Sequence, residues 1–170
     1  MKERPILFSA PMVRALLDGS KTQTRRAVKR FEVRSGMPEP EMASLLRCCP
    51  YGQPGDLLWV RESFQTHTGS YGESIVYAYR ATDDQRLGPW KPSIHMPRAA
   101  SRITLEVTGV HIDRLQDISR GDAMEEGCPF PNMAQGPDPR QWYADLWEQI
   151  NGPDSWATNT WVWVVEFRRA

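Results

Sequence analysis

Apolar residues near the start of the chain follow first a strand-like and then a helix-like pattern. Residues 6–8 form a short apolar run between two prolines, which is typical of a strand. Apolar residues then recur from Met12 to Leu17 at the spacing of a helical face, and Gly19 stands where a left-handed C-cap would end that helix. The pattern predicts a strand and a helix, which give the next polar segment a fixed starting point.

Four later segments have the alternation or composition of strands. Residues 57–64 follow a Pro-Gly-Asp turn signal, and residues 74–80 alternate well enough to pair with them as a hairpin across a loop at residues 69–72. Residues 102–112 alternate clearly, so we expect this strand at the centre of the sheet. The aromatic and β-branched stretch 161–167 is expected to close the sheet.

Two helices are predicted in the second half of the chain. Ser119 and Asp122 have the spacing of a capping box, and Gly127 is placed to end the short helix that begins there. Asp138 and Pro139 form an N-cap followed by proline at the first helical position. The apolar residues that follow share one helical face: Trp142, Tyr143, Leu146, Trp147 and Ile150. We interpret this face as core rather than as a stacking platform for a ligand.

The remaining long stretches are rich in proline and glycine. Residues 31–54 predict an irregular excursion with a helical turn near residues 42–46, and residues 129–137 predict a loop. Residues 90–98 contain two prolines and no periodicity, so we expect a loop that leads into the strand at 102–112.

Composition indicates a single soluble domain. The chain has 170 residues, of which 40% are hydrophobic and 25% are charged, so one domain with a substantial core is expected. No apolar run approaches the ~20 residues that span a bilayer, and the N-terminus leads into no signal-peptide core, which predicts a cytoplasmic protein without a membrane partner. The three cysteines and three histidines form no metal-ligand spacing and no disulfide framework, so we expect no metal.

The charges are unevenly distributed although the formal net charge is zero. Residues 1–34 hold nine Lys and Arg against three acids, whereas residues 111–155 hold three Arg against nine acids. The basic first third could steer a nucleotide or RNA to a site, or it could pair with the acidic last third inside one fold. The sequence supports both interpretations equally.

The polar segment at residues 19–26, Gly-Ser-Lys-Thr-Gln-Thr-Arg-Arg, contains most of a hydrolytic site. Lys21 can act as a base when it is neutral, Thr24 needs such a base to become a nucleophile, and Arg26 can hold an anion or a polarised carbonyl. On chemistry alone, a solvated basic edge strand is the more frequent explanation of such a run.

Other candidate residues lie on the strand at 57–64 and in the loop at 90–98. Trp59 and Arg61 share one face of that strand, opposite Glu62, and Trp59 is more often a core residue than a platform for a nucleobase. His95 and Arg98 could close over a base, although a loop histidine is more often a surface residue.

Glu126 is expected to be the last residue of the short helix that Gly127 ends. A carboxylate at this place lies near the negative end of the helix dipole, which favours the protonated form that a proton donor needs. Without further information, a solvent-facing glutamate at a helix end is the more frequent explanation.

Four motif blocks, in order, resemble the ASCH family. The first is Gly19-x-Lys21-x-x-Thr24-x-Arg26, and the others are GDLLWVRE at 55–62, DAMEEG at 122–127 and WVWVVEF at 161–167. They are similar to those of phage and bacterial members of that family of small PUA-like domains, which are associated with RNA and modified nucleosides. The resemblance implies an α+β fold: a PUA-like mixed β-barrel of about five to seven strands with two or three packed helices. It further implies a single domain, 1–170, with insertions near 31–54 and 128–140.

The resemblance also implies a function. Similarity to the N(4)-acetylcytidine amidohydrolases of this family implies hydrolysis of the acyl amide of a modified nucleoside, without metal or organic cofactor. In that chemistry Lys21 takes a proton, Thr24 attacks the acetyl carbonyl, and Glu126, which directly precedes the glycine of its motif, protonates the leaving amine. The expected substrate-binding residues are Arg26, Trp59, Arg61, His95 and Arg98, of which Arg26 and Arg98 would stabilise charge.

Two other functions remain open at this stage. The same basic cleft could belong to a non-catalytic RNA-binding module, or to an RNA-cleaving enzyme of the ASCH type. The substrate could be a free nucleoside, an RNA or another acylated amine, and the sequence does not fix the oligomeric state. In an ideal strand Lys21 and Thr24 would point to opposite faces, so the segment has to bend for the two side chains to meet.

Overall fold

The structure is a computed structural model that describes residues 1–29, 33, 35–68, 75–83, 88–130 and 136–170. The strands are β1 (Glu3–Leu7), β2 (Gln23–Ala27), β3 (Leu57–Arg61), β4 (Phe64–Thr68), β5 (Ile75–Tyr79), β6 (Thr104–Arg114) and β7 (Trp161–Arg169). The α-helices of the described residues are α1 (Ala10–Asp18), α2 (Glu39–Arg47), α3 (Arg120–Glu125) and α4 (Pro139–Asn151). Single 3₁₀ turns are η1 (Ser93–His95), η2 (Arg98–Ala100) and η3 (Leu115–Asp117).

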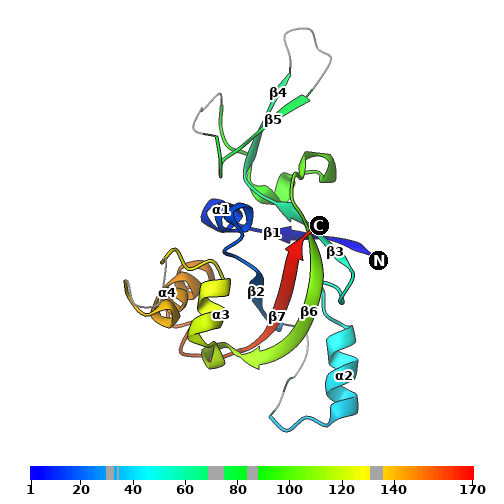
Figure 1. Ribbon diagram of the computed structural model, residues 1–170, viewed down its shortest axis with the longest axis vertical. Helices are drawn as coiled ribbons and strands as arrows, with labels where there is room; N and C mark the ends of the chain where they lie inside the picture. Colours follow the sequence, from blue (N-terminus) through cyan, green and yellow to red (C-terminus); the bar gives the residue numbers. More distant parts are fainter. Residues whose placement is uncertain (30–32, 34, 69–74, 84–87, 131–135) are drawn as a thin grey trace.

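Five strands form one bent sheet in the order β1-β3-β6-β7-β2 (Figure 1). Strands β1 and β3 pair in parallel because α1 and β2 intervene between them, and the other pairs are antiparallel. The two edge strands approach each other, since the Arg26 Nη2 of β2 donates to the Leu7 carbonyl of β1 at 2.8 Å. The sheet is therefore curled toward a barrel.

Strand β7 is buried on both faces and separates two hydrophobic cores. Trp163, Val165 and Phe167 point into the first core, which lies inside the curled sheet with residues of β1, β3, β6 and α1. Val162 and Val164 point into the second core, which lies beneath α3 and α4. This double burial explains why β7 is a continuous apolar run rather than an alternating one.

Helix α1 places the start of β2. It ends at Gly19, whose φ of 83° gives the left-handed C-cap that the sequence predicts. Lys21 forms an isolated bridge with Glu126, and regular pairing with β7 begins only at Gln23. The expected bend in this segment therefore lies between Lys21 and the first residue of β2.

The fold class predicted from the sequence is confirmed. The structure is α+β, with a mixed five-stranded sheet, a separate two-stranded sheet and strands at the predicted segments. The capping box at Ser119 and the N-cap at Asp138 both form, and β6 is the central strand of the large sheet. The described residues contain four α-helices rather than two or three, because the turn expected near residues 42–46 is the full helix α2.

The predicted hairpin between residues 57–64 and 74–80 is wrong. The first segment divides after Arg61: β3 pairs with β1 and β6, whereas β4 pairs with β5 in a separate sheet that projects from the barrel (Figure 1). The physical reason is that β1 and β6 occupy both edges of β3, so no edge of β3 is left to pair with β5. Between β3 and β4, the buried Glu62 carboxylate receives two hydrogen bonds from Arg102 at 2.9 and 3.1 Å. The expected loop at residues 69–72 lies outside the described residues.

One smaller expectation is also corrected. Strand β7 does not close the sheet, because it lies between β6 and β2 and the edges are β1 and β2. The loop expected at residues 90–98 is present, and it contains the 3₁₀ turn η1 and leads into η2.

Gly127 is a position where a side chain would disturb the connection between α3 and α1. Its φ is +95°, and an added Cβ would lie 2.9 Å from the Ala15 Cβ and 3.3 Å from the Lys21 Cβ. We expect Gly127→Ala to lower the free energy of unfolding by about 1–3 kcal/mol, measured by urea denaturation. Gly121→Ala is the control, since this helical glycine has ordinary φ and an added Cβ would meet only the Ser119 Oγ at an ordinary 3.6 Å, so the variant should be neutral or stabilising. A neutral Gly127→Ala variant would contradict this packing.

Candidate active site

Lys21 and Glu126 form a fully buried ion pair. The Lys21 Nζ lies 2.8 Å from Glu126 Oε2, and the two side chains are 0% and 1% exposed. The same ammonium donates to the backbone carbonyls of Glu126 at 2.8 Å and Gln23 at 2.9 Å. An ammonium group has three N–H donors, so these three bonds use all of them.

Arg25 holds the other side of the same carboxylate. Its Nη1 lies 3.4 Å from Glu126 Oε1, and its Nη2 lies 3.1 Å from Asp122 Oδ2. Each Glu126 oxygen therefore faces one cation, and Asp122 provides a second carboxylate for the arginine. Burial by itself would raise the pKa of Asp122, but hydrogen bonds from Ser119 and the charge of Arg25 hold that pKa below its ordinary value.

The local sequence explains why Glu126 is at this place. Ser119 and Asp122 exchange the two hydrogen bonds of the capping box, which fixes the first turn of α3. Glu126 is the C-cap of that helix, and its free carbonyl accepts from Lys21 as cations do at helix C-termini. The Thr22 N–H donates to the Glu125 carbonyl at 2.9 Å, so the backbone as well as the side chains joins the two segments.

The buried environment changes the acid–base behaviour of Lys21. Burial lowers the pKa of the ammonium, the nearby Arg26 and Arg25 act in the same direction, and Glu126 opposes them. The resulting pKa lies below that of an ordinary lysine. This is the direction in which the pKa of a lysine has to move before its amine can act as a base.

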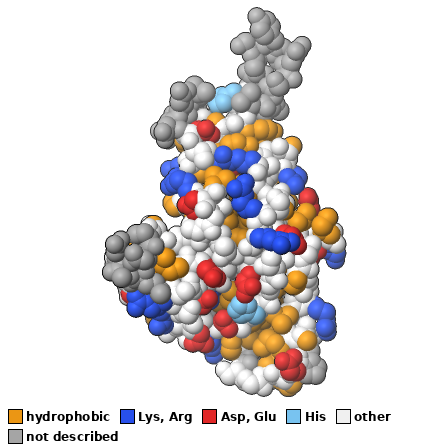
Figure 2. All heavy atoms as spheres, viewed as in Figure 1, with side chains coloured by type: hydrophobic (Ala, Val, Ile, Leu, Met, Phe, Trp, Pro, Cys, Tyr) orange, Lys and Arg blue, Asp and Glu red, His pale blue; other side chains and the backbone are white. Residues whose placement is uncertain are grey.

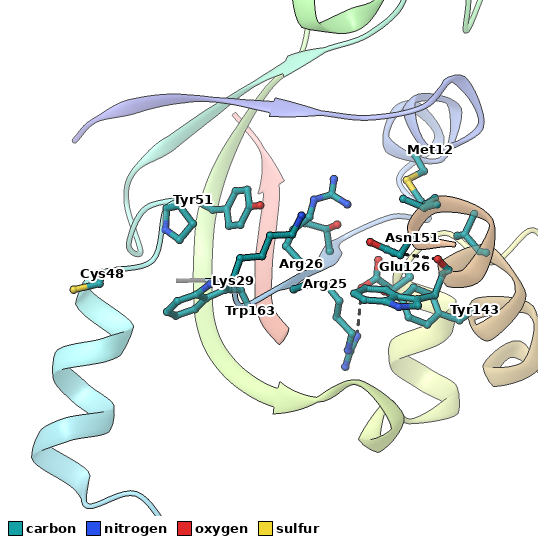
Figure 3. A pocket seen from close by; sticks show the side chains of 16 residues that line it. Met12, Arg25, Arg26, Lys29, Cys48, Tyr51, Glu126, Tyr143, Asn151 and Trp163 are labelled. Carbon is teal, nitrogen blue, oxygen red and sulfur yellow. Dashed lines mark hydrogen bonds and ion pairs between the residues drawn. The ribbon is translucent and has the colours of Figure 1, made fainter. Parts of the chain in front are cut away.

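A cavity of about 460 Å³ opens beside this ion pair, along the free edge of β2. Because β2 is an edge strand, residues from both of its faces reach the cavity, namely Thr24 and Arg26 from one face and Arg25 from the other. In Figure 3, Tyr51 and Lys29 lie on one side of the cavity, and Tyr143 and Asn151 of α4 lie on the other. A volume of this size suits a small organic ligand.

The structure brings four predicted site residues together. Thr24, Arg26 and Glu126 line the cavity, and Lys21 is buried directly behind Glu126. Thr24 is only 1% exposed, so its hydroxyl is shielded from bulk water. The three donors of Lys21 are directed to other acceptors, so Lys21 does not donate to Thr24 in this arrangement.

The other predicted substrate-binding residues lie elsewhere. Trp59 and Arg61 point away from the first core on β3, and neither they nor His95 and Arg98 line the cavity. The guanidinium groups of Arg61 and Arg98 lie 5.4 and 5.9 Å from the Trp59 ring centroid. Arg98 also forms a bidentate ion pair with Glu3, while His95 is exposed on η1. The structure thus groups these residues with each other and not with Lys21.

The sequence did not reveal that α4 forms one wall of the cavity. The apolar face of α4 is divided, because Tyr143 and Trp147 belong to the second core and also line the cavity, together with Leu146 and Ile150. The exposure of Ile150, 55%, shows that this face is not wholly core. The excess of aromatic residues on a short amphipathic helix was the signal that could have suggested a ligand wall.

The charge polarity of the sequence is partly neutralised inside the fold. Lys21 and Arg25 of the basic first third pair with Asp122 and Glu126 of the acidic last third, which favours the second of the two interpretations. Lys29 remains exposed at the cavity. On the face shown in Figure 2, basic and acidic side chains are interspersed, and some lie next to each other.

Two searches of the described residues were negative. They contain no group of three or more His, Cys, Asp or Glu side chains that could hold a metal ion. None of the helices among them has the length and apolar character needed to cross a bilayer.

Comparison with known proteins identifies the fold. No protein-family model matches the sequence, and no curated protein matches it. The chain superposes on an ASCH domain from Lactobacillus crispatus JV V101 with a TM-score of 0.50 and 12% identity, covering 99% of this chain and 79% of that one. It also matches a protein of the family DUF984 from Enterococcus faecalis V583, with a TM-score of 0.48 and 9% identity, covering 100% and 81%. The ASCH-domain fold expected from the motif blocks is confirmed.

Removing the Glu126 carboxylate should unbalance the buried charges. Glu126→Ala leaves Lys21 and Arg25 buried without the carboxylate that they share, and we expect a loss of about 3–5 kcal/mol in the free energy of unfolding. Glu125→Ala is the matched control, because that neighbouring side chain is exposed and its removal should change stability by less than about 0.5 kcal/mol. Equal urea midpoints for the two variants would show that the pair contributes nothing to stability.

Proposed function

We propose that this ASCH-fold protein hydrolyses the acyl amide of a modified nucleoside, with N(4)-acetylcytidine giving cytidine and acetate. The observation that carries the proposal is the buried Lys21–Glu126 pair, which adjoins a cavity whose wall contains the Thr24 hydroxyl. A base, a nucleophile and an acid are thereby gathered from segments about a hundred residues apart. The resemblance of the four motif blocks to acetylcytidine amidohydrolases supplies the substrate class.

The ion pair supports acid–base chemistry because one proton can be shared between its two members. Transfer of that proton from the Lys21 ammonium to the Glu126 carboxylate gives a neutral amine and a carboxylic acid without changing the total charge. The neutral pair has the protonation states that amide cleavage requires of a base and an acid. Burial, which lowers the pKa of Lys21, favours the uncharged lysine.

The reaction then proceeds in two balanced steps. Thr24 Oγ1 attacks the acyl carbon while Lys21 takes its proton, the C–N bond breaks, and Glu126 gives its proton to the leaving amine. This step leaves an ester on Thr24 together with the charged ion pair. Water then attacks the ester, Glu126 accepts a proton from the water, and Lys21 returns its proton to Thr24. Arg26 stabilises negative charge at the acyl oxygen.

A second candidate function is non-catalytic binding of RNA at the same cavity. Two observations favour it: all three Lys21 donors are used within the protein, and Lys29 is an exposed cation at the cavity wall. In such a module the cavity would hold an extruded base, and the cations would contact phosphate groups.

Substitution of Lys21 distinguishes the enzyme from the binding module. Lys21→Arg keeps the positive charge but cannot lose its proton, so it should abolish acetylcytidine hydrolysis, measured by chromatography of cytidine and acetate. Thr24→Ala should do the same because it removes the nucleophile. In the wild-type protein, activity should rise with pH through a midpoint well below the ~10.4 of a free lysine and fall again at higher pH, because the active pair holds one shared proton that is lost at high pH. Near wild-type turnover by Lys21→Arg would exclude Lys21 as the base.

Salt and Lys29 provide a second, independent test. Hydrolysis of a free nucleoside, which carries no phosphate, should be almost unchanged between about 50 and 200 mM salt, whereas RNA binding should weaken steeply. Replacing both Lys29 and Arg30 with Glu should weaken RNA binding and leave nucleoside hydrolysis nearly unchanged. Arg30 lies outside the described residues, so Lys29→Glu alone is the structural test of the exposed cation. If RNA affinity is the same in this variant, Lys29 is not a phosphate contact.

A further inference from the structure

The cations that surround Thr24 already donate to groups of the protein. Lys21 uses its three donors on Glu126 and Gln23, and Arg25 directs Nη1 and Nη2 to Glu126 and Asp122. Arg26 directs Nη2 to the Leu7 carbonyl. Most donors of the charged floor are therefore engaged within the protein, with the buried Arg25 Nε as an exception among the described residues, so a further donor for the ligand beside Arg26 is sought on another wall.

Tyr143 of α4 is placed to provide such a donor. Its side chain lines the same cavity as Thr24 and Glu126, although the residue is only 3% exposed. The Tyr143 ring contacts three aromatic rings, each with its centroid 6.3 Å away: Trp142, Trp147 and Trp156. Because Tyr143 lines the cavity, its hydroxyl is within reach of a ligand bound there.

The surroundings keep the Tyr143 hydroxyl in its neutral, donating form. Burial raises the pKa of this phenol well above its ordinary value, the Glu126 carboxylate adds to the effect, and Arg25 and Arg26 oppose it. The effect of Glu126 also indicates that Tyr143 lies within electrostatic reach of the proposed acid. Tyr143 can therefore donate a hydrogen bond without giving up its proton.

Trp147, one turn after Tyr143, carries a second donor on this wall. It is 5% exposed and lines the cavity, and its indole N–H is buried without a hydrogen-bond partner among the described residues. Residues four apart on a helix share a face, so both donors belong to the same wall. A buried N–H without a partner is costly and uncommon, and a ligand oxygen is one means of satisfying it.

We propose that Tyr143 is a substrate-binding catalytic residue whose hydroxyl donates a hydrogen bond to the acyl carbonyl oxygen of the substrate, with the Trp147 indole as second donor. As Thr24 Oγ1 bonds to the acyl carbon, the π electrons of the C=O bond move onto this oxygen, and Tyr143 stabilises the negative charge while keeping its proton. This role rests on the proposed function, because it adds Tyr143 and Trp147 to Arg26 as groups that bind the acyl oxygen in that reaction. It places catalytic residues on α4, outside the four motif blocks.

The test compares Tyr143→Phe with Trp156→Phe on N(4)-acetylcytidine. Tyr143→Phe keeps the ring and removes only the hydroxyl, so kcat should fall on the order of 10²-fold with a smaller change in KM, as on loss of one oxyanion donor. Trp156 packs on the Tyr143 ring but does not line the cavity, so its variant should retain near wild-type kcat. Both variants should keep the wild-type pH midpoint. Near wild-type kcat in Tyr143→Phe, or an equal loss in Trp156→Phe, would overturn the assignment.

A binding measurement distinguishes failure of the Tyr143 assignment from failure of the proposed function. If the wild-type protein does not hydrolyse acetylcytidine, the proposed function fails, and calorimetry of N(4)-acetylcytidine with wild-type protein and both variants decides the role of Tyr143. A hydrogen bond to the acyl oxygen predicts affinity about tenfold weaker for Tyr143→Phe than for Trp156→Phe. Equal affinities, or no binding to any of the proteins, would overturn Tyr143 as a ligand donor.

Discussion

The buried contact between Lys21 and Glu126 is the constraint on which the architecture of the site depends. Two charges removed from water are stable only when each is closely paired and its remaining hydrogen-bonding groups are satisfied. Here this requires the end of α1, the start of β2 and the end of α3 to meet at one point, where a short backbone bridge reinforces the side-chain contact. Gly19 and Gly127 allow the chain to turn at both sides of this point.

The position of β2 determines where a ligand can enter. An edge strand has a free side, and natural proteins usually cover or protect such an edge. In this protein β2 is joined to β7 on one side, while its other side faces a cavity whose opposite wall is α4. Side chains from both faces of β2 therefore reach one cavity, and Thr24 and Arg25 both line it although they point to opposite faces of the strand.

The site combines a charged floor with a neutral aromatic wall. The Lys21, Arg25, Asp122 and Glu126 cluster neutralises itself, so its interactions hold the floor together even without a ligand. The aromatic residues of α4 serve the second core and the cavity at the same time, which makes their orientation rigid. Such pre-organisation is what a site needs in order to act on charge that develops only during a reaction. Trp59 and the Arg61 and Arg98 side chains next to it have no part in this arrangement, because the face of β3 that carries Trp59 and Arg61 points away from the barrel interior.

The sequence by itself determined the features that depend on neighbouring residues. The Gly19 cap, the capping box at Ser119, the N-cap at Asp138 and the strand periodicity of β6 are local, and each follows from the geometry of a single turn or strand. The order of the motif blocks predicted the ASCH fold, and it also predicted that Lys21, Thr24 and Glu126 lie close together. Only the tertiary structure decided which strands pair: β3 has partners that are distant in the sequence, so its separation from β4 could not follow from local pattern. It likewise decided that α4 lines the cavity while Trp59 and His95 do not, since a side chain's environment depends on segments far away in the chain.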